Sequence, residues 1–445
     1  MKKVLILAYD FPPYVSVGGM RPYNWHRYLK EFDVEPVVIT RQWSNTNGNH
    51  LDYISEGESE ETIVEETEFG TIIRTPYYPN FANRIMLKYG NTKYKFLRKL
   101  ISAYYEFAQY LFPIGPKIEL YKAAQDYLKT EKIDAIIATG DPFILFKYAS
   151  KLSNEFNIPW IADYRDTWVQ DKTRSSNLIS RKWNSYFESS YLKNVNTIVT
   201  VSTFIQKQLE GHLKSKSYEI ILNGFNPDVM EKAKNIIQET ELFTIAFAGT
   251  IYEWHPIESF LKTCNHFCQQ GKEIQVLFYG VNAPEKLEKL IDSNFPDLKQ
   301  SVKIYPKTEN ERLVELLAKA NLFLLFNDYS ILGTKIFTYL GLKRKMILCY
   351  SDDREAKILK ENHYNLTEFV SESKQLQADL IHETNSGIIV RDSAHLLEVL
   401  KDLYDEFRAT GQIACDSIGV EKYSRKIQVE KLAELVKEVG IVASC

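Results

Sequence analysis

Short apolar runs that alternate with amphipathic stretches constrain the fold of this chain more than any other feature. In the first half, the runs expected to be strands are Val4–Ala8, Val37–Thr40, Ile72–Arg74, Ala135–Thr139, Trp160–Asp163, Thr197–Val201 and Ile220–Leu222. The second half repeats the pattern with Phe243–Ala248, Gln275–Tyr279, Val302–Ile304, Leu322–Phe326, Met346–Cys349 and Gly387–Val390. Such alternation is typical of a doubly wound α/β sheet, in which helices cover both faces of parallel strands. Because the pattern restarts, we predict two such domains.

The boundary between the two expected domains lies where the composition changes. Residues 223–241 contain Gly, Asn and Pro followed by a polar helical stretch, which is typical of a linker. We therefore predict an N-terminal domain over residues 1–226 and a C-terminal domain over residues 242–418, with a ligand cleft between the carboxyl ends of their strands. The last helical stretch, Val420–Val439, is compatible with packing on its own domain or on the first one.

Composition and charge exclude several classes of protein. The formal net charge of −3 gives no basic field that would favour a nucleic-acid partner. Five irregularly spaced cysteines favour a reducing compartment. Cys264, His266 and Cys268 do not indicate a metal site, because on a helix the histidine points away from both cysteines. The N-terminal apolar run is too short for a signal peptide, and no run approaches the roughly 18 apolar residues of a membrane span. We expect a cytoplasmic protein that can sit on a membrane surface.

The first half also contains an acidic segment followed by a basic one. Leu51–Gly70 is rich in Glu and is expected to be a solvated loop or hairpin. Phe81–Tyr105 then carries six cations and no carboxylate, and apolar residues recur at helical spacing up to Leu111. We predict a basic amphipathic helix within residues 81–111. It fits two interpretations equally: packing on its own domain, or docking on an anionic membrane surface or a lipid-linked substrate.

A candidate phosphate-binding segment lies in the second half and reads S-I-L-G-T-K-I-F-T-Y-L-G over Ser330–Gly341. The small-residue turn Gly333–Thr334 opens a short helix, and Lys335 falls in its first turn. Free backbone N–H groups and the helix dipole favour an anion there, and a lysine adds a charge that suits a diphosphate. Taken alone, the segment fits better with a surface lysine followed by core residues.

Two motifs of the first half follow strands. The loop F-P-P-Y-V-S-V-G-G-M-R brings Gly18–Gly19 to a helix start and Arg21 just inside it. The glycines allow close approach of a ligand and Arg21 could clamp an anion or sugar hydroxyls, unless the loop is a plain strand-to-helix turn. In D-Y-R-D-T-W, the residues Asp163, Arg165 and Asp166 end a buried strand and are expected at the cleft. Structural pairing of Arg165 with an aspartate is compatible with that role.

Taken in order, the motifs resemble those of glycosyltransferases with the GT-B fold, specifically family 4 and its bacterial cell-surface polysaccharide branch. The matching pieces are F-P-P…G-G-x-R, D-x-R-D-x-W, T-V-S-T-F, I-L-N-G-F-N-P, F-A-G-T-I-Y, F-Y-G, T-K-I-F-T-Y-L-G and N-S-G-I-I-V. They cover nearly the whole length of the chain. Each piece is weak alone, and their order and spacing make the set fairly specific.

The resemblance implies a retaining transfer from a UDP- or GDP-linked sugar to a glycan or lipid-linked acceptor, without a metal or other cofactor. The second domain would bind the donor and the first the acceptor, and the final segment, residues 419–445, would cross back to the first domain. Gly18, Gly19 and Arg21 match an acceptor-side loop near the donor phosphates. The positions that match the donor site are Gly249 and Thr250 at the diphosphate, Gly280 near the base, and Lys335 and Tyr339 on the donor-binding helix.

The chain also departs from the family pattern. Members usually carry E-x7-E around the donor-binding helix, where this chain has Ser330 and Thr338. The usual Arg and Lys-Gly after the first strand of the donor domain are missing, and Ile251–Tyr252 and Trp254–His255 occupy that region. Either Lys335 supplies the displaced charge and Thr338 a weaker ribose hydrogen bond, or the chain is a degenerate homologue.

A retaining transfer requires stabilisation of the charge that develops on the leaving diphosphate. We assign this role to Lys335, Arg21 and the amides of Gly249–Thr250, and we assign Asp166 to the acceptor. Two alternatives remain. A sugar-nucleotide 2-epimerase needs acid/base carboxylates and histidines, and only His255 lies close to a strand end. A non-catalytic partner subunit would explain the absent glutamates.

Overall fold

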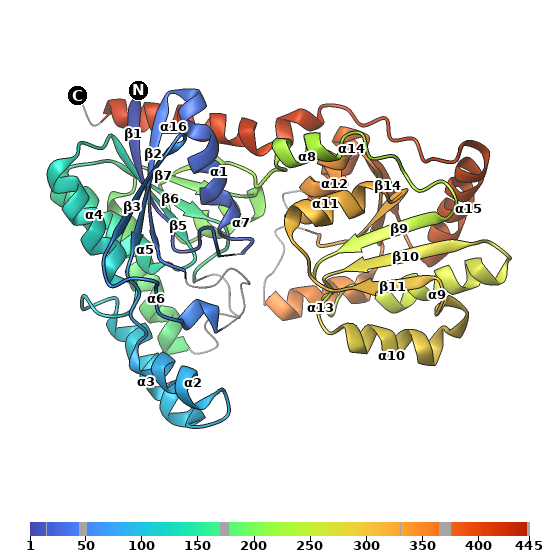
Figure 1. Ribbon diagram of the computed structural model, residues 1–445, viewed down its shortest axis with the longest axis horizontal. Coiled ribbons are helices and arrows are strands. Elements are labelled where there is room, and N and C mark those ends of the chain that lie inside the picture. The colour runs from blue at the N-terminus through green and yellow to red at the C-terminus, as the bar shows by residue number, and fades with distance from the viewer. Residues whose placement is uncertain (15, 44–50, 170–177, 330, 365–374, 443–445) are drawn as a thin grey trace. The chain divides into compact units, whose positions relative to one another are not determined.

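The computed structural model describes residues 1–442 apart from 15, 44–50, 170–177, 330 and 365–374. The chain forms two compact units. Unit 1 comprises Met1–Leu222 together with the C-terminal residues from Gln428 onward, and unit 2 comprises Asn223–Ile427. Figure 1 labels most of their helices and strands.

Unit 1 is built on an eight-stranded sheet. Its strands are β1 (Lys2–Leu7), β2 (Val34–Arg41), β3 (Ile63–Thr67), β4 (Gly70–Thr75), β5 (Ala135–Gly140), β6 (Trp160–Tyr164), β7 (Thr197–Thr200) and β8 (Ser217–Ile220). They lie in the order β3-β4-β2-β1-β5-β6-β7-β8, and all neighbours are parallel except β3 and β4. The acidic segment therefore contributes an exposed hairpin strand, β3, at the edge of the sheet.

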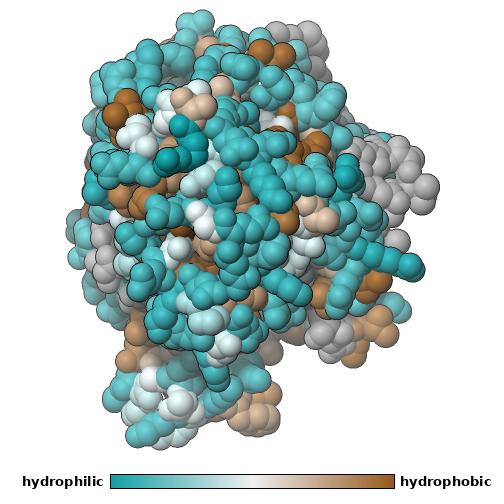
Figure 2. Space-filling model, turned by 90° about the vertical axis from the view of Figure 1, so that its right-hand side faces the viewer, coloured by the Kyte–Doolittle hydropathy of each residue, from teal (hydrophilic) through white to brown (hydrophobic). Residues whose placement is uncertain are grey.

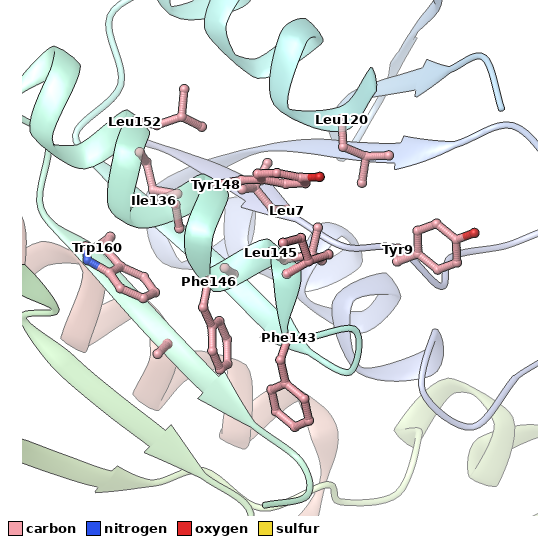
Figure 3. Packing of buried hydrophobic residues seen from close by; sticks show 14 of the residues in the cluster. Leu7, Tyr9, Leu120, Ile136, Phe143, Leu145, Phe146, Tyr148, Leu152 and Trp160 are labelled. Atoms are coloured by element: carbon pink, nitrogen blue, oxygen red, sulfur yellow. The ribbon is translucent and has the colours of Figure 1, made fainter. Parts of the chain in front are cut away.

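Helices cover both faces of this sheet. The helices of unit 1 are α1 (Met20–Tyr28), α2 (Phe81–Tyr89), α3 (Lys95–Ala108), α4 (Ile118–Thr130), α5 (Ile144–Phe156), α6 (Leu178–Tyr191), α7 (Thr203–Glu210) and α16 (Arg425–Val442). Of these, α2 and α3 pack on each other and extend beyond the sheet (Figure 1). Alternate residues of β1 enter different cores: Leu5 and Leu7 pack with α4 and α5, whereas Val4 and Ile6 pack with α1 and α16. Figure 3 shows part of the first core, with Tyr148 and Trp160 among its large side chains. Burial on both faces explains why the strand reads as a continuous apolar run.

The basic segment forms two helices, α2 and α3, and not the single helix that its periodicity predicts. The break lies at Gly90, with φ of 78°, and Tyr94, with φ of 55°. Positive φ at both positions ends a right-handed helix. Arg98 is buried and donates to the backbone carbonyl of Asn91, so one of the six cations stabilises the turn between the helices.

Unit 2 repeats the architecture with six strands. These are β9 (Phe243–Ala248), β10 (Ile274–Tyr279), β11 (Val302–Tyr305), β12 (Leu322–Phe326), β13 (Lys345–Cys349) and β14 (Gly387–Val390), all parallel in the order β11-β10-β9-β12-β13-β14. The helices are α8 (Pro227–Ala233), α9 (Ile257–Gln269), α10 (Pro284–Asn294), α11 (Asn310–Ala318), α12 (Lys335–Leu342), α13 (Arg354–Tyr364), α14 (Leu376–Thr384) and α15 (Ser393–Thr410). One core packs α9, α10 and α15 against the sheet and includes Cys264.

The predicted fold class, two Rossmann-like α/β domains with parallel sheets, is confirmed by these two sheets. The C-terminal helix α16 packs on unit 1, where Val429, Leu432 and Val436 join the core of β1. Gln428 accepts a hydrogen bond from the backbone N–H of Leu222 at 2.8 Å.

Surface character agrees with amphipathic helices that bury one stripe. The face shown in Figure 2 is mostly hydrophilic, and its hydrophobic residues form small separate groups. Among the described residues, no helix combines the length and the apolar character needed to cross a membrane.

Gly224 packs against Tyr423 within unit 2, and this contact provides a test of the packing there. At Gly224, with φ of 67°, a Cβ would lie 2.7 Å from the carbonyl oxygen of Tyr423. At Gly271, with φ of 76°, a Cβ would meet no atom within 4 Å. Alanine at either position incurs the left-handed penalty of about 1–2 kcal/mol, and only Gly224→Ala adds a clash with backbone. We expect Gly224→Ala to lower the free energy of unfolding by about 2 kcal/mol more than Gly271→Ala, measured by urea denaturation; equal losses would contradict the packing.

Candidate functional site

The strand order of unit 2 indicates where a ligand would bind. Successive strands lead away from β9 on one side and from β12 on the other, so the order reverses between these neighbours. In open α/β sheets, ligands bind beyond the carboxyl ends of the strands at such a reversal. Gly249 directly follows β9, and Asp328 lies just beyond β12.

Lys335, the first residue of α12, extends to the end of β9. Its ammonium Nζ lies 3.4 Å from the carbonyl oxygen of Thr250 and 4.1 Å from the ring centroid of Phe247. Burial lowers the pKa of Lys335 to about 8, although the negative charge of Asp328 acts in the opposite direction. Helix α12 has no acidic residue in its first turn and no side chain that caps its N-terminus. The result is a cation with weak protein partners at a helix start.

Asp328 organises the groups around this lysine. Its Oδ1 accepts hydrogen bonds from Trp254 Nε1 and His255 Nε2, both at 3.1 Å. The backbone N–H of Tyr252 donates to His255 Nδ1 at 3.2 Å, so Nδ1 is unprotonated and the neutral ring carries its proton on Nε2. Burial lowers the pKa of His255, with Asp328 opposing the shift. Burial alone would raise the pKa of Asp328, but His255, Lys335 and Trp254 lower it overall, so the carboxylate stays charged.

The other predicted donor-side residues divide into half-buried positions and core. Gly249 has φ of 96°, and a Cβ there would lie 3.8 Å from Lys335 Nζ. Gly280 directly follows β10 and has φ of 61°. Thr338 is half-buried on α12. Tyr339 is buried, stacks on Phe323 at 4.3 Å between ring centroids, and accepts a hydrogen bond from the N–H of Ala248 at 2.9 Å. It therefore fixes α12 against the end of β9. Ser330 lies outside the described residues.

In unit 1, the structure joins two of the predicted residues. Arg21 forms a fork with Asp163: its Nε lies 3.0 Å from Oδ1 and 3.2 Å from Oδ2, and a terminal nitrogen lies 2.8 Å from Oδ1. The other terminal nitrogen donates to the carbonyl of Leu222 at 3.1 Å. Both side chains are buried. Arg21 thus links α1, β6 and the segment that follows β8, and its role at the donor phosphates stays a prediction.

The glycine loop packs against Arg165. A Cβ on Gly18 would lie 2.0 Å from a guanidinium nitrogen of Arg165, so a larger residue there would displace the end of that side chain. Arg165 donates to the carbonyls of Gly140 and Asp141, at 2.9 and 2.8 Å. The N–H of Gly19 donates to Ser16 Oγ at 2.8 Å. Asp166 is exposed beyond β6. These residues form the rim of the sheet at the ends of β1, β5 and β6.

Sequence reasoning missed Asp328 and a cavity of about 470 Å³ in unit 1, whose lining includes Tyr9, Lys117 and Asp141. Asp328 and Asp141 each follow a predicted strand by one or two residues, so a search for charges at strand ends would have found them. Lys117 carries no such signal, because it precedes a helix. Within the described ranges, no group of three or more His, Cys, Asp or Glu side chains could hold a metal ion.

Comparison with known proteins identifies the fold. No family model matches the sequence, and no curated protein matches it significantly. A UDP-forming α,α-trehalose-phosphate synthase from Burkholderia xenovorans, in complex with glucose-6-phosphate, is similar in structure: identity is 12%, coverage is 98% of this chain and 100% of that one, and the TM-score is 0.60. Sucrose-phosphate synthase from Thermosynechococcus elongatus is 12% identical over 99% of this chain and 97% of that one, with a TM-score of 0.56. HepE from Anabaena, in complex with UDP-glucose, is 11% identical over 98% of this chain and 100% of that one, with a TM-score of 0.53. The chain has the GT-B fold.

The buried Arg21–Asp163 pair yields a stability prediction. Removing one partner of a buried pair leaves an uncompensated charge and costs about 3–5 kcal/mol. The matched surface pair, Lys3 with Glu131 at 3.1 Å, contributes about 1 kcal/mol or less. We expect Asp163→Ala to lower the free energy of unfolding by several times the loss caused by Glu131→Ala, measured by urea denaturation. Similar losses for both variants would show that the buried pair is not a structural link.

Proposed function

We propose that this protein is a retaining glycosyltransferase that moves a sugar from a UDP- or GDP-linked donor to a glycan or lipid-linked acceptor in cell-surface polysaccharide synthesis. The observation that carries the proposal is the desolvated Lys335 ammonium beside Gly249 and Thr250, at the strand-order reversal of unit 2. A cation with weak protein partners, next to a glycine turn and a helix N-terminus, suits a diphosphate.

In the proposed mechanism, the chain stabilises the leaving group. As the bond between the sugar and the diphosphate breaks, negative charge develops on the phosphate oxygen, and Lys335 with the amides of Gly249–Thr250 neutralises it. The departing phosphate oxygen takes the proton of the acceptor hydroxyl, whose oxygen forms the new bond on the same face of the sugar. Asp328 remains a carboxylate and favours the charged form of Lys335. His255, neutral and bonded to Asp328, holds that carboxylate in place.

The named structures with the same fold support the donor class. HepE is in complex with UDP-glucose, and the trehalose-phosphate synthase is UDP-forming. The sequence resemblance supports the retaining outcome and the polysaccharide role. On the acceptor side, we propose that Gly18, Gly19 and Arg165 shape the rim of unit 1, that the Arg21–Asp163 pair holds it, and that Asp166 contacts the acceptor.

We also propose that α2 and α3 attach the protein to an anionic membrane. Five of the six cations are exposed: Arg84, Lys88, Lys93, Lys95 and Lys99. The same helices expose large apolar residues, including Phe96, which is 76% exposed, and Tyr104, which is 61% exposed. Exposed apolar and cationic groups on one helical pair are typical of interfacial attachment.

Donor binding tests the function directly. A thermal-shift panel of nucleotide-sugars should identify one that stabilises the protein, and purified protein with that donor and a lipid extract should release free nucleotide. Lys335→Met should weaken binding of that donor by about 1–3 kcal/mol, because a charge-assisted contact is lost. Because burial lowers the pKa of Lys335 to about 8, affinity should be full below pH 8 and fall as the pH rises above it. In the complex, the negative charge of the bound phosphate favours the protonated lysine and so raises the pKa of Lys335 above its value in the free protein.

The matched control is Lys289→Met. Lys289 is exposed on α10, and this variant should bind the donor like the wild type. Lys335→Met should also lose the decline of affinity at alkaline pH. If no nucleotide-sugar shifts the melting temperature, the chain is a non-catalytic partner subunit. If the Lys335 variant binds like the control, the lysine does not contact the diphosphate.

Vesicle binding tests membrane attachment. Reversing Lys88, Lys95 and Lys99 to Glu should abolish co-sedimentation with phosphatidylglycerol-containing vesicles, since each cation near such a surface contributes about 1 kcal/mol. Arg98 is left unchanged because it stabilises the turn. Reversal of Lys122, Lys129 and Lys132 around α4 is the control. If both triple variants lost vesicle binding equally, the loss would follow from the change in net charge. That result would contradict attachment through α2 and α3.

A further inference from the structure

The carboxylate of Asp328 uses only one of its two oxygens in the contacts that hold it. Oδ1 accepts hydrogen bonds from Trp254 Nε1 and His255 Nε2, both at 3.1 Å. Among the residues that the structure describes, none donates a hydrogen bond to Oδ2. Asp328 is only 8% exposed, and a carboxylate so far removed from water normally accepts hydrogen bonds at both oxygens. Oδ2 is therefore an acceptor that a ligand can satisfy.

Lys335 is close enough to act on this carboxylate but does not bond to it. Its ammonium contacts the carbonyl oxygen of Thr250 at 3.4 Å, and it lowers the pKa of Asp328 through its charge alone. Within the described part of the chain, no hydrogen bond or ion pair joins the ammonium to the carboxylate. A cation and an anion that share a site without touching can bind different parts of one ligand.

Two glycines leave space beside both charged groups. A Cβ at Gly249 would have Cε and Nζ of Lys335 as its nearest atoms, both at 3.8 Å, and a Cβ at Gly333 would lie 4.0 Å from Asp328 Oδ2. Apart from the chain neighbours of each glycine, no other described atom lies within 4 Å of either position. A turn without a side chain lets a ligand approach closely. The ammonium and Oδ2 are thus both accessible to a bound molecule.

Packing fixes the direction in which Oδ2 points. The ring of Trp254 is buried and stacks on Tyr252, with 4.4 Å between ring centroids and 4° between ring planes. His255 is also buried, and the backbone N–H of Asp328 donates to Gln377 Oε1 at 2.6 Å. Because the carboxylate is already held in one orientation, a ligand that bonds to Oδ2 does not have to order it.

The proposed donor presents suitable groups in a fixed order. The oxygens of its diphosphate are acceptors, which a carboxylate repels, and the proposed mechanism places Lys335 at the phosphate that carries the sugar. The sugar is joined to that phosphate by a single oxygen atom, so its ring hydroxyls are the nearest hydrogen-bond donors. The ribose hydroxyls lie farther away, beyond the second phosphate. A sugar hydroxyl is therefore the group that suits Oδ2 when Lys335 contacts the diphosphate.

We propose that Asp328 is a specificity-determining residue, whose Oδ2 accepts a hydrogen bond from one hydroxyl of the donor's sugar. This role rests on the proposed glycosyltransferase function and adds the class of sugar: one that carries a free hydroxyl at the position Asp328 contacts. A site built to bond a hydroxyl discriminates against the analogue that lacks it, because the buried acceptor is then left unpaired.

The test combines a change in the ligand with a change in the protein. Binding of the full chain is measured by calorimetry for three ligands: the nucleotide-sugar that gives the largest thermal shift, each of its monodeoxy analogues in the sugar ring, and the free nucleoside diphosphate. In every variant the affinity is divided by that for the diphosphate, so that an indirect effect on Lys335 cancels. We expect one deoxy analogue to bind the wild type about tenfold more weakly than the parent, or weaker still.

Asp328→Asn removes the charge from the acceptor and closes the cycle. The penalty for the same deoxy analogue should fall to about threefold or less, since a neutral amide makes a weaker bond to the hydroxyl. The matched control is Asp402→Asn. Asp402 is exposed on α15, and this variant should keep the penalty of the wild type.

Gly333→Ala is a second variant, which leaves Asp328 and its partners in place. Its methyl group would lie 4.0 Å from Oδ2, an ordinary contact that the fold accommodates while the approach to the oxygen narrows. We expect it to weaken binding of the nucleotide-sugar and to leave binding of the diphosphate unchanged. Gly211→Ala, whose Cβ would come no closer than 3.7 Å to another described atom, is the control and should change neither.

Two results would overturn the proposal. If every monodeoxy analogue bound the wild type like the parent, no sugar hydroxyl would be contacted by Asp328. If Asp328→Asn kept the full penalty, the hydroxyl would be bound by another group and Oδ2 by water. In both cases the nucleotide-sugar and the diphosphate still bind, so the proposed function stands. Absence of binding by every nucleotide-sugar would instead refute the proposed function, and this role of Asp328 with it.

Discussion

Burial of parallel strands on both faces is the constraint on which the rest of each unit depends. A strand covered by helices on both sides has little room for polar side chains along its length, so polar groups gather beyond its carboxyl end. Asp328 beyond β12 and Asp141 beyond β5 occupy corresponding places in the two sheets, each beside the strand where the order reverses. The sheets thereby set where chemistry can occur before any particular ligand is considered.

Each of these aspartates favours the charged form of a lysine, whereas burial of that lysine disfavours it. Desolvation lowers the pKa of Lys335 and of Lys117, and in both cases the aspartate at the neighbouring strand end opposes the shift. An ammonium held away from water with few acceptors gains most from a ligand that supplies oxygen atoms. The lysines lie at helix starts and the aspartates at strand ends, so the two members of each pair are distant in the sequence. Neither residue by itself therefore indicates that the pair forms.

Helix α3 presents two faces of different character: one lines the cavity of unit 1, and the other lines an apolar groove that Trp183 of α6 completes. Its cavity-facing and groove-facing residues are separated by helical periodicity alone, so the polar wall and the apolar surface can change independently in sequence. The break between α2 and α3 gives the helix its own direction, and Arg98 holds that break through Asn91. One cation of the basic segment is thus structural, and the remaining exposed ones are available to a surface.

Most of the fold was predictable from the sequence. For buried strands such as Phe243–Ala248 and Leu322–Phe326, the apolar run in the sequence begins and ends at the same residues as the strand in the structure. Exposed elements were less visible: β3 is a polar edge strand, and the break at Gly90–Tyr94 depends on backbone conformation that periodicity does not record. The sequence by itself determined two doubly wound sheets and the lysine at the start of α12, because burial and local propensity act over a few neighbouring residues. Only the tertiary structure decided that Arg21 bonds Asp163, that Tyr339 is core, that Asp328 lies near Lys335 and that Lys117 lines a cavity with Asp141, because these depend on contacts between residues far apart in the chain.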